Sequence, residues 1–455
     1  MRTSDMNKYV FIGLAILLIQ HKALCQGLFD SVASVENVFD PASIIEWNGY
    51  TRGTVFGGSE NYDYSSVFGE FAFQSTLKYK SAFLFSDLRF RGGIFFDRDT
   101  IQLQIKEAYA GYQGTTIDVY FGNQIVQWGR TDGFNPTNNI TPNDYFFLTP
   151  NPDDQKLSNT LLRLKYRINA QIELDLIGIP AFKPSIYRYD LFTITEGAHF
   201  VDAEVPGHKF DNGSLAGRLN FEYAKAGFSF SYFNGLDPFY GFRVDEIDLT
   251  QSFPVIQFIP DFYRKQTLGA DYALFLGPWI TRGEIAYSHT KDYKDNMYIP
   301  NPEIAYVFGL EHNFIGITAI LQYVGKYISD FTELQPAMLL DPNDLEQLIQ
   351  YMQDRIVYES SIFNRKIFNQ QEEFNHALFL TVNRSFLHEI IQIELSGYYN
   401  ITSEEYLLRP TLSWKITDYL QTRIGGSYMK GPENSVFDLS KSVLNGVFVE
   451  LKVSY

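Results

Sequence analysis

The sequence contains little cysteine, no long apolar run beyond its first residues, and no excess of positive charge. Its single cysteine is Cys25, so disulfide bonds cannot stabilise the rest of the chain. A helical membrane span needs about 20 mostly apolar residues in a row, and no such run follows residue 19. The formal net charge of -16 at pH 7 also argues against nucleic acid as a partner, because nucleic-acid binding requires a basic surface.

The first 25 residues have the pattern of a secretory signal peptide. Arg2 and Lys8 form a short basic region, residues 9–19 are apolar, and residues 23–25 fit a cleavage site. A membrane anchor is the alternative, but the apolar stretch of about eleven residues is too short to span a bilayer. A lipid-modified Cys25 is less compatible with the residues before it. We therefore predict cleavage after Cys25 and a short periplasmic lead-in over 26–42.

Aromatic residues are abundant, and they occur in alternating patterns. They make up 16% of the chain, with 40 Phe and 31 Tyr, while mean hydropathy is only -0.16. In 67–80, 389–399 and 443–455, apolar and polar residues alternate, as in strands with one apolar face. Transmembrane β-barrels combine such strands with aromatic girdles. The fold class predicted for 43–455 is therefore all-β, a transmembrane antiparallel up-and-down β-barrel of 16–18 strands, with 18 preferred.

The lengths of the connectors between the predicted strands indicate which end of the barrel faces the periplasm. Short turns alternate with mostly long loops, which is typical of barrels with short periplasmic turns and long extracellular loops. Within the long connector 329–370, residues 342–357 have helical spacing and predict a helix over the barrel mouth, with a plug or a partner-docking helix as alternatives. The predicted strands are 43–55, 67–80, 82–96, 101–113, 115–128, 158–168, 170–182, 213–224, 226–236, 262–276, 278–290, 302–313, 315–328, 371–384, 388–401, 404–416, 419–430 and 443–455.

Charged residues occupy the alternate strand positions that carry polar side chains, and this face of each strand should line the lumen. They could guide an anionic solute, or they could form cross-strand ion pairs that brace the wall; we expect the second role for about half of them. A three-residue turn at 169–171 would place Arg167 near Glu173 and Lys165 near Asp175. The candidate pore cations are Arg89, Arg91, Arg163, Lys165, Arg167 and Arg282, and further inward candidates are Arg218, Arg409 and Arg423.

The polar connector 129–157 is the best candidate for narrowing the lumen, because a loop this long is usually functional or disordered. Its candidate residues are Arg130, Asp132 and Asn135, together with Trp128 at its start. Trp128 could stack on a ring of the solute, although packing or an aromatic girdle is favoured. Arg130 and Asp132 could pair with each other, and a simple surface loop is the alternative to a constriction.

The sequence contains no pattern for catalysis or for a cofactor. The seven histidines have no metal-ligand spacing, and there is no phosphate-binding loop and no nucleophile motif. We therefore predict no catalytic residue, no metal and no cofactor, with a barrel enzyme kept as an alternative.

Three segments resemble a known family. "GNQIVQWG" (122–129) followed by "NPTN" (135–138) is similar to the G-R-Q-x-V-x-W-G…N-P segment of DUF1302-type outer-membrane proteins, relatives of alginate-export and phosphate-selective porins. The stretches 217–238 and 409–437 resemble that family's hairpins. Asn123 stands where the family has Arg, and Arg130 follows the W-G where an acid or a small residue is common. The resemblance implies a barrel in the outer membrane of a Gram-negative bacterium and passage of solutes.

These observations predict a porin that passes small polar or anionic solutes through a lumen narrowed by 129–157, with outer-membrane lipid and the solute as partners. A second hypothesis is the outer-membrane component of an export system for polysaccharide or lipid-like cargo, with an inner-membrane or periplasmic partner. A barrel enzyme is a third hypothesis, and a structural or adhesive barrel with a blocked lumen is a fourth.

Overall fold

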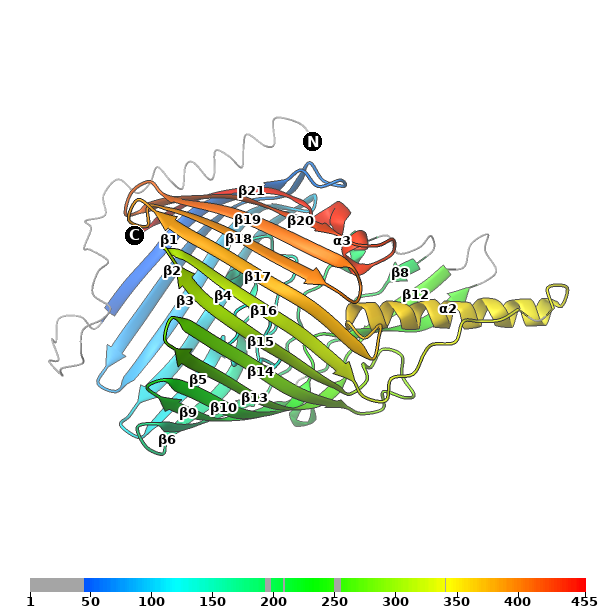
Figure 1. The fold of residues 1–455 in the computed structure, drawn as a ribbon, viewed down its shortest axis with the longest axis horizontal. Coiled ribbons are helices and arrows are strands. Elements are labelled where there is room, and N and C mark those ends of the chain that lie inside the picture. The colour runs from blue at the N-terminus through cyan, green and yellow to red at the C-terminus, as the bar shows by residue number, and fades with distance from the viewer. Residues whose placement is uncertain (1–44, 193–197, 208, 249–254, 340) are drawn as a thin grey trace.

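The computed structural model describes residues 45–455 except 193–197, 208, 249–254 and 340. The signal peptide predicted for 1–25 and the lead-in predicted for 26–42 therefore lie outside the described residues. A closed barrel dominates the molecule (Figure 1). Its antiparallel sheet has 18 strands, so the preferred strand number is confirmed.

Each barrel strand pairs with its neighbours along the chain, and β1 pairs with β21 to close the sheet. The closure continues to the last residue, where the backbone of Tyr455 exchanges hydrogen bonds of 3.0 and 3.1 Å with that of Gly49. The strands are β1 Ile45–Gly57, β2 Tyr64–Tyr79, β3 Ala82–Phe95, β4 Arg98–Gln113, β5 Ile117–Gln124, β6 Asn159–Arg167, β7 Ile172–Ile179, β9 Ser214–Tyr223, β10 Ala226–Leu236, β13 Arg264–Leu276, β14 Trp279–Thr290, β15 Glu303–Phe314, β16 Ile317–Ile328, β17 Phe374–Phe386, β18 Ile391–Asn400, β19 Glu405–Lys415, β20 Leu420–Lys430 and β21 Gly446–Ser454.

The two faces of the barrel differ because side chains alternate along each strand. The outer face is apolar and exposed, as at Ile101, Leu103, Phe121, Leu268, Ile285, Phe308 and Leu321. The inner face is charged, and Arg52, Glu70 and Arg91 stand side by side in register on β1, β2 and β3. A lipid-facing exterior thus encloses a polar interior.

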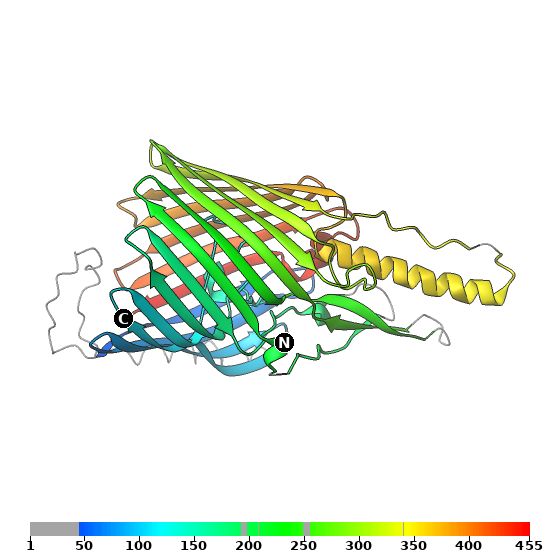
Figure 2. The ribbon, with the colours of Figure 1, turned by 90° about the horizontal axis from the view of Figure 1, so that it is seen from below.

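The long connectors gather at one end of the barrel, opposite the short turns (Figures 1 and 2). A small sheet there, which was not predicted from the sequence, consists of β8 Ala198–Phe200, β11 Gly241–Asp248 and β12 Val255–Asp261. The helix α2, Leu345–Ile367, is longer than the predicted 342–357. It runs outward from the rim rather than across the mouth (Figure 2), so the prediction of a helix lying over the mouth is wrong.

Two further details differ from the predicted elements. The strand predicted over 115–128 ends at Gln124, where the chain turns into the lumen. A second helix, α3 Val436–Leu444, follows its N-cap Ser435 and occupies the predicted connector 431–442. Three short 3-10 helices, η1 Pro152–Gln155, η2 Tyr189–Leu191 and η3 Phe210–Asn212, lie in the connectors. In the described part of the chain, no helix is both long enough and apolar enough to cross a membrane.

Candidate functional site

The connector between β5 and β6, residues 125–158, folds into the barrel, and we call it the lumen loop. It leaves the wall at β5, packs Val126 and Trp128 against β6 and β7, and then reaches β14. There the Glu284 carboxylate accepts hydrogen bonds from the backbone amides of Arg130 and Thr131, at 2.7 and 2.8 Å. The loop then returns to β1, β3 and β4 before β6 begins. A polar segment without a core of its own is therefore held by the barrel wall.

Arg130 and Asp132 bind the wall and not each other, so the pairing considered for them is wrong. Arg130 makes ion pairs with Glu222 at 2.5 Å and Asp271 at 2.7 Å. Asp132 meets Arg282 at 2.9 Å. Burial raises the pKa of Asp132, although Arg282 opposes this shift. The two loop charges thus attach the loop to β9, β13 and β14, close to the Glu284 contact.

Trp128 packs in the interior, as favoured from the sequence. Its side chain is 2% exposed and lies in an apolar cluster with Val126, Ile140 and Leu161. Its indole Nε1 donates to Asp175 at 3.3 Å, which satisfies the polar edge of a buried ring. Trp128 is therefore not available to stack on a solute, whereas Asn135 lines the open cavity described below.

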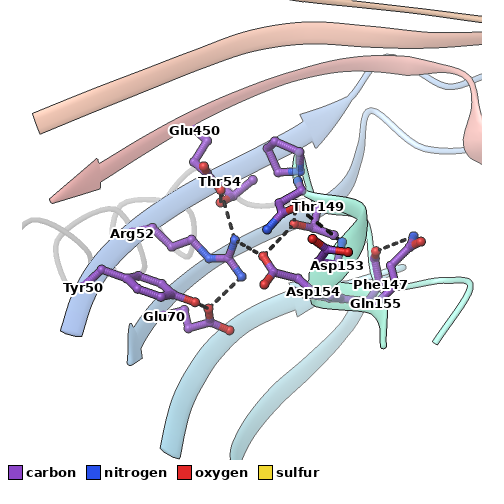
Figure 3. A network of polar contacts seen from close by, with 12 residues as sticks. Tyr50, Arg52, Thr54, Glu70, Phe147, Thr149, Asp153, Asp154, Gln155 and Glu450 are labelled. Carbon is purple, nitrogen blue, oxygen red and sulfur yellow. Dashed lines mark hydrogen bonds and ion pairs between the residues drawn. The ribbon is translucent and has the colours of Figure 1, made fainter. Parts of the chain in front are cut away.

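The second half of the lumen loop is held by a buried ionic network (Figure 3). Asp154, in η1, accepts from Arg52 at 2.7 Å and from Arg89 at 2.8 Å. Burial alone would raise the pKa of Asp154, but the two guanidinium groups outweigh burial and hold this pKa well below its usual range. The ammonium of Lys106 donates to the carbonyl oxygens of Asp154, at 2.8 Å, and of Lys156, at 2.5 Å.

Glu70 and Glu450 complete this network from the wall. Glu70 pairs with Arg52 at 2.7 Å and with Arg91 at 2.5 Å, while Glu450 pairs with Arg52 at 3.2 Å. The guanidinium of Arg91 also lies 3.7 Å from the centre of the Phe147 ring. Arg89 and Arg91, predicted as pore cations, are thus buried and neutralised by carboxylates.

The basic row on β6 is paired as well. The predicted register is confirmed, with Lys165 opposite Asp175 and Arg167 opposite Glu173. The ion pairs, however, run diagonally: Arg163 meets Asp175 at 2.6 Å and Lys165 meets Glu173 at 3.0 Å. Arg167 turns the other way to Asp118 on β5. Arg282 is also paired, with Asp132 and Glu311. All six candidate pore cations, Arg89, Arg91, Arg163, Lys165, Arg167 and Arg282, therefore have a carboxylate partner.

An open cavity of about 1080 Å³ lies between the lumen loop and the wall formed by β13 to β20. The loop contributes Asp132, Phe134 and Asn135, and the wall contributes Arg409 and Arg423 among others. Phe134 packs against Tyr398 and Phe379 of β18 and β17, with ring centres 5.2 and 5.9 Å away. One side of the cavity is therefore aromatic, while the wall carries both cations and the carboxylates of Glu303, Glu394 and Glu405.

Three lumen cations on adjacent strands have no carboxylate partner. They are Arg409 on β19, Arg423 on β20 and Lys452 on β21, and no described acid comes within the 4.0 Å of an ion pair. Arg409 donates only to the backbone carbonyls of Thr149 and Pro150, at 2.7 and 3.3 Å. Strand parity identified Arg409 and Arg423 as inward-facing, but sequence alone does not show which lumen charges are left without partners.

A second cavity, of about 430 Å³, lies on the short-turn side of the lumen loop. Its charged lining includes Arg130, Arg163, Lys165, Arg167, Glu173, Asp175 and Glu222. Within the described ranges, no group of three or more His, Cys, Asp or Glu side chains could hold a metal ion.

Solved structures share this architecture. The outer membrane protein opdK of Pseudomonas aeruginosa aligns with a TM-score of 0.53 at 8% identity, over 90% of this chain and 98% of that one. The chain has the fold of this outer-membrane barrel. OccAB3 of Acinetobacter baumannii gives 0.52 at 11% identity, covering 90% and 98% of the two chains. OccK2 (OpdF) of P. aeruginosa, solved in complex with glucuronate, gives 0.51 at 10%, covering 90% and 97%.

No protein-family model and no curated protein matches the sequence. The resemblance to DUF1302-type proteins therefore stays a prediction. At these identities, the structural likeness establishes a closed barrel and leaves solute and selectivity to be argued from this chain's own residues.

Proposed function

We propose that the protein is an outer-membrane channel of a Gram-negative bacterium that passes small polar solutes, with a preference for anions. The barrel supports this location because its outer face is apolar and each of its strands pairs with two neighbours in a closed sheet. The short turns would then face the periplasm, and α2 with the sheet β8–β11–β12 would face outward. One protein with this fold, OccK2, has been solved with glucuronate, a small anion.

The three cations without a carboxylate partner, Arg409, Arg423 and Lys452, carry the proposal for anions. A charge in a confined, low-dielectric space attracts ions of opposite sign unless a neighbour neutralises it. Most lumen cations here are neutralised, so they brace the wall. Arg409 and Arg423 make no ion pair and border the open cavity, where a passing anion would meet them. Lys452 lies on the adjacent strand β21.

Reversal potentials in a salt gradient across planar bilayers test this function. The native channel should prefer anions, and Arg423→Gln/Lys452→Gln should shift the reversal potential toward cations. As a control, Glu46→Gln/Lys78→Gln removes an exposed ion pair at the short-turn rim and should leave the preference unchanged. A native preference for cations, or an unaltered preference in the double variant, would contradict the proposal.

The lumen loop is proposed as the constriction, with Arg130, Asp132 and Asn135 as its main residues. It crosses the lumen and borders both cavities. Replacing 131–146 by a short Gly-Ser linker should raise single-channel conductance. A conductance equal to that of the native channel would show that the loop does not limit passage.

An export role would require a periplasmic or inner-membrane partner, which would meet the short-turn rim. Co-purification from solubilised membranes tests it: recovery of an inner-membrane transporter would favour export over passive passage. In the described part of the chain, no observation favours the barrel-enzyme hypothesis.

A further inference from the structure

The Glu284 carboxylate on β14 is bound almost entirely by the lumen loop. Besides the amides of Arg130 and Thr131, it accepts from the hydroxyl of Thr131 at 2.6 Å. It also accepts from the amide and the hydroxyl of Thr137, at 3.3 and 2.8 Å. The residue is 4% exposed, and no described Lys, Arg or His makes an ion pair with it.

The loop is shaped around this carboxylate. Gly129 has φ +102°, and a Cβ atom at this position would lie 2.5 Å from the Glu284 Oε1 atom. A side chain at residue 129 would therefore displace the carboxylate. Successive backbone amides that turn inward form a concave site for an anion, and here the anion is supplied by the barrel wall.

The contact differs in kind from the one at the other end of the loop. Asp154 holds the second half through guanidinium groups, whereas Glu284 holds the first half through neutral donors alone. Hydrogen bonds to a charged group each contribute about 1.5–3 kcal/mol. The cavity-lining residues 132–136 lie between the Glu284 contacts of Thr131 and Thr137, so their position depends on this carboxylate.

We propose that Glu284 is the positioning residue that fixes segment 129–137 of the lumen loop and thereby sets the conductance of the channel. This inference rests on the proposed channel function. Loss of the carboxylate removes five hydrogen bonds and leaves this segment held only at its side chains, by the ion pairs of Arg130 and Asp132 and the packing of Phe134. The segment then moves more while Asp154 still holds the rest, so the channel fluctuates between conductance levels instead of keeping one.

Single-channel recordings of Glu284→Ala and Glu284→Gln test the proposal. The alanine variant should show higher open-channel noise and a raised mean conductance. The glutamine variant should lie between it and the native channel, because one amide oxygen cannot accept five hydrogen bonds. Heat-modifiable migration on gels confirms that each variant forms the barrel. A folded alanine variant with native conductance and noise would overturn the proposal.

An engineered disulfide between the lumen loop and β13 should restore the native behaviour of the Glu284→Ala variant. A Cβ atom built on Gly269 lies 3.3 Å from Cβ of Thr137, close to the spacing of about 3.5–4.5 Å that a disulfide needs. Adding Thr137→Cys/Gly269→Cys to Glu284→Ala should restore low noise under oxidation and lose it under reduction. Noise that persists after the cross-link forms would show that the free segment is not its source.

A control and a second readout separate this inference from the channel function. Glu173→Gln removes a lumen carboxylate that pairs only with Lys165 on the wall and should keep native noise. Hydrogen exchange of 129–137 in the detergent-solubilised barrel should be faster in Glu284→Ala than in the native protein, whether or not the barrel conducts. If exchange is faster in Glu284→Ala but the native protein does not conduct, the proposed channel function is refuted and the positioning role of Glu284 stands. If exchange is the same in the two proteins, the positioning role is refuted.

Discussion

At the scale of single residues, the lumen shows how side-chain length decides which charges meet. Lys165 faces Asp175 across the hairpin, yet it reaches past it to Glu173. Arg163 takes Asp175 instead. Long side chains lean along their strand, so diagonal neighbours lie within reach. Register, which follows from the turn, therefore does not determine the ion pairs.

The pH dependence of selectivity should follow Asp132. Burial raises its pKa above the ordinary value, so it takes up a proton earlier than an exposed Asp as the pH falls. Protonation removes a negative charge beside Arg282 and the cavity. We expect the anion preference of the native channel to rise between about pH 7 and about pH 4, and to rise less in Asp132→Asn. Equal pH profiles of reversal potential in the two proteins would contradict this assignment.

The pKa of Asp154 is shifted in the opposite direction to that of Asp132. Its folded-state pKa is lowered by Arg52 and Arg89, so its contribution to stability is fully present above its unfolded pKa and is lost only as the pH falls through the lower folded value. Removing one partner of such a buried pair typically costs about 3–5 kcal/mol. This half of the loop should therefore stay docked over the range in which Asp132 titrates.

At the scale of elements, the structure outside the barrel depends on contacts between distant connectors. The helix α2 lies against β11, where the Asn364 amide donates to the carbonyl of Phe242 and accepts from its backbone N–H, both at 2.8 Å. Phe242 is fully buried in an aromatic cluster with Tyr189 and Phe258. The Asn364 side chain thus satisfies the backbone N–H and carbonyl of a residue that lies 122 positions earlier in the chain.

Replacing Asn364 by alanine should loosen β11. The substitution leaves two buried backbone groups without partners, at a cost of about 1–3 kcal/mol. Hydrogen exchange over 241–248 should accelerate, while exchange in the barrel strands stays the same. Gln350→Ala, which removes an exposed contact to Asp354 on the same helix, is the matched control. Unchanged exchange in 241–248 would show that the small sheet is held by its aromatic cluster alone.

At the scale of the whole molecule, the stability of the barrel depends on apolar side chains facing the lipid and polar side chains facing the lumen. Leu321 lies near the middle of β16 and points outward, whereas Thr381 on the paired β17 points inward to Ser396. An arginine on the lipid face near the bilayer midplane costs about 2–4 kcal/mol. Leu321→Arg should lower the free energy of unfolding in lipid vesicles by this amount, measured by urea titration. Thr381→Arg should lower it much less, and equal losses would contradict the assignment of faces.

Much of the barrel could be predicted because its signals are local. A period of two identifies a strand and its faces within about ten residues, and connector lengths show which ends lie together. All eighteen barrel strands overlap the predicted ranges. The sheet of β8, β11 and β12 was missed because it lies within connectors predicted to be irregular. β11 and β12 pair inside the connector 237–261, and β8 joins β12 from the connector 183–212. The strand predicted to reach residue 128 ends at Gln124, because Val126 and Trp128 pack in the interior with the lumen loop.

The sequence by itself determined that this chain forms a closed barrel with an apolar exterior and a charged lumen, since alternation along a strand fixes which side chains share a face. Only the tertiary structure decided which charges are neutralised. Arg52 meets residues 102 and 398 positions away, and Arg130 meets Glu284 across 154 positions. Such partners are brought together by closure of the sheet and by the path of the lumen loop. Neither of these produces a pattern in the sequence near the residues concerned. That closure leaves Arg409, Arg423 and Lys452 without carboxylates.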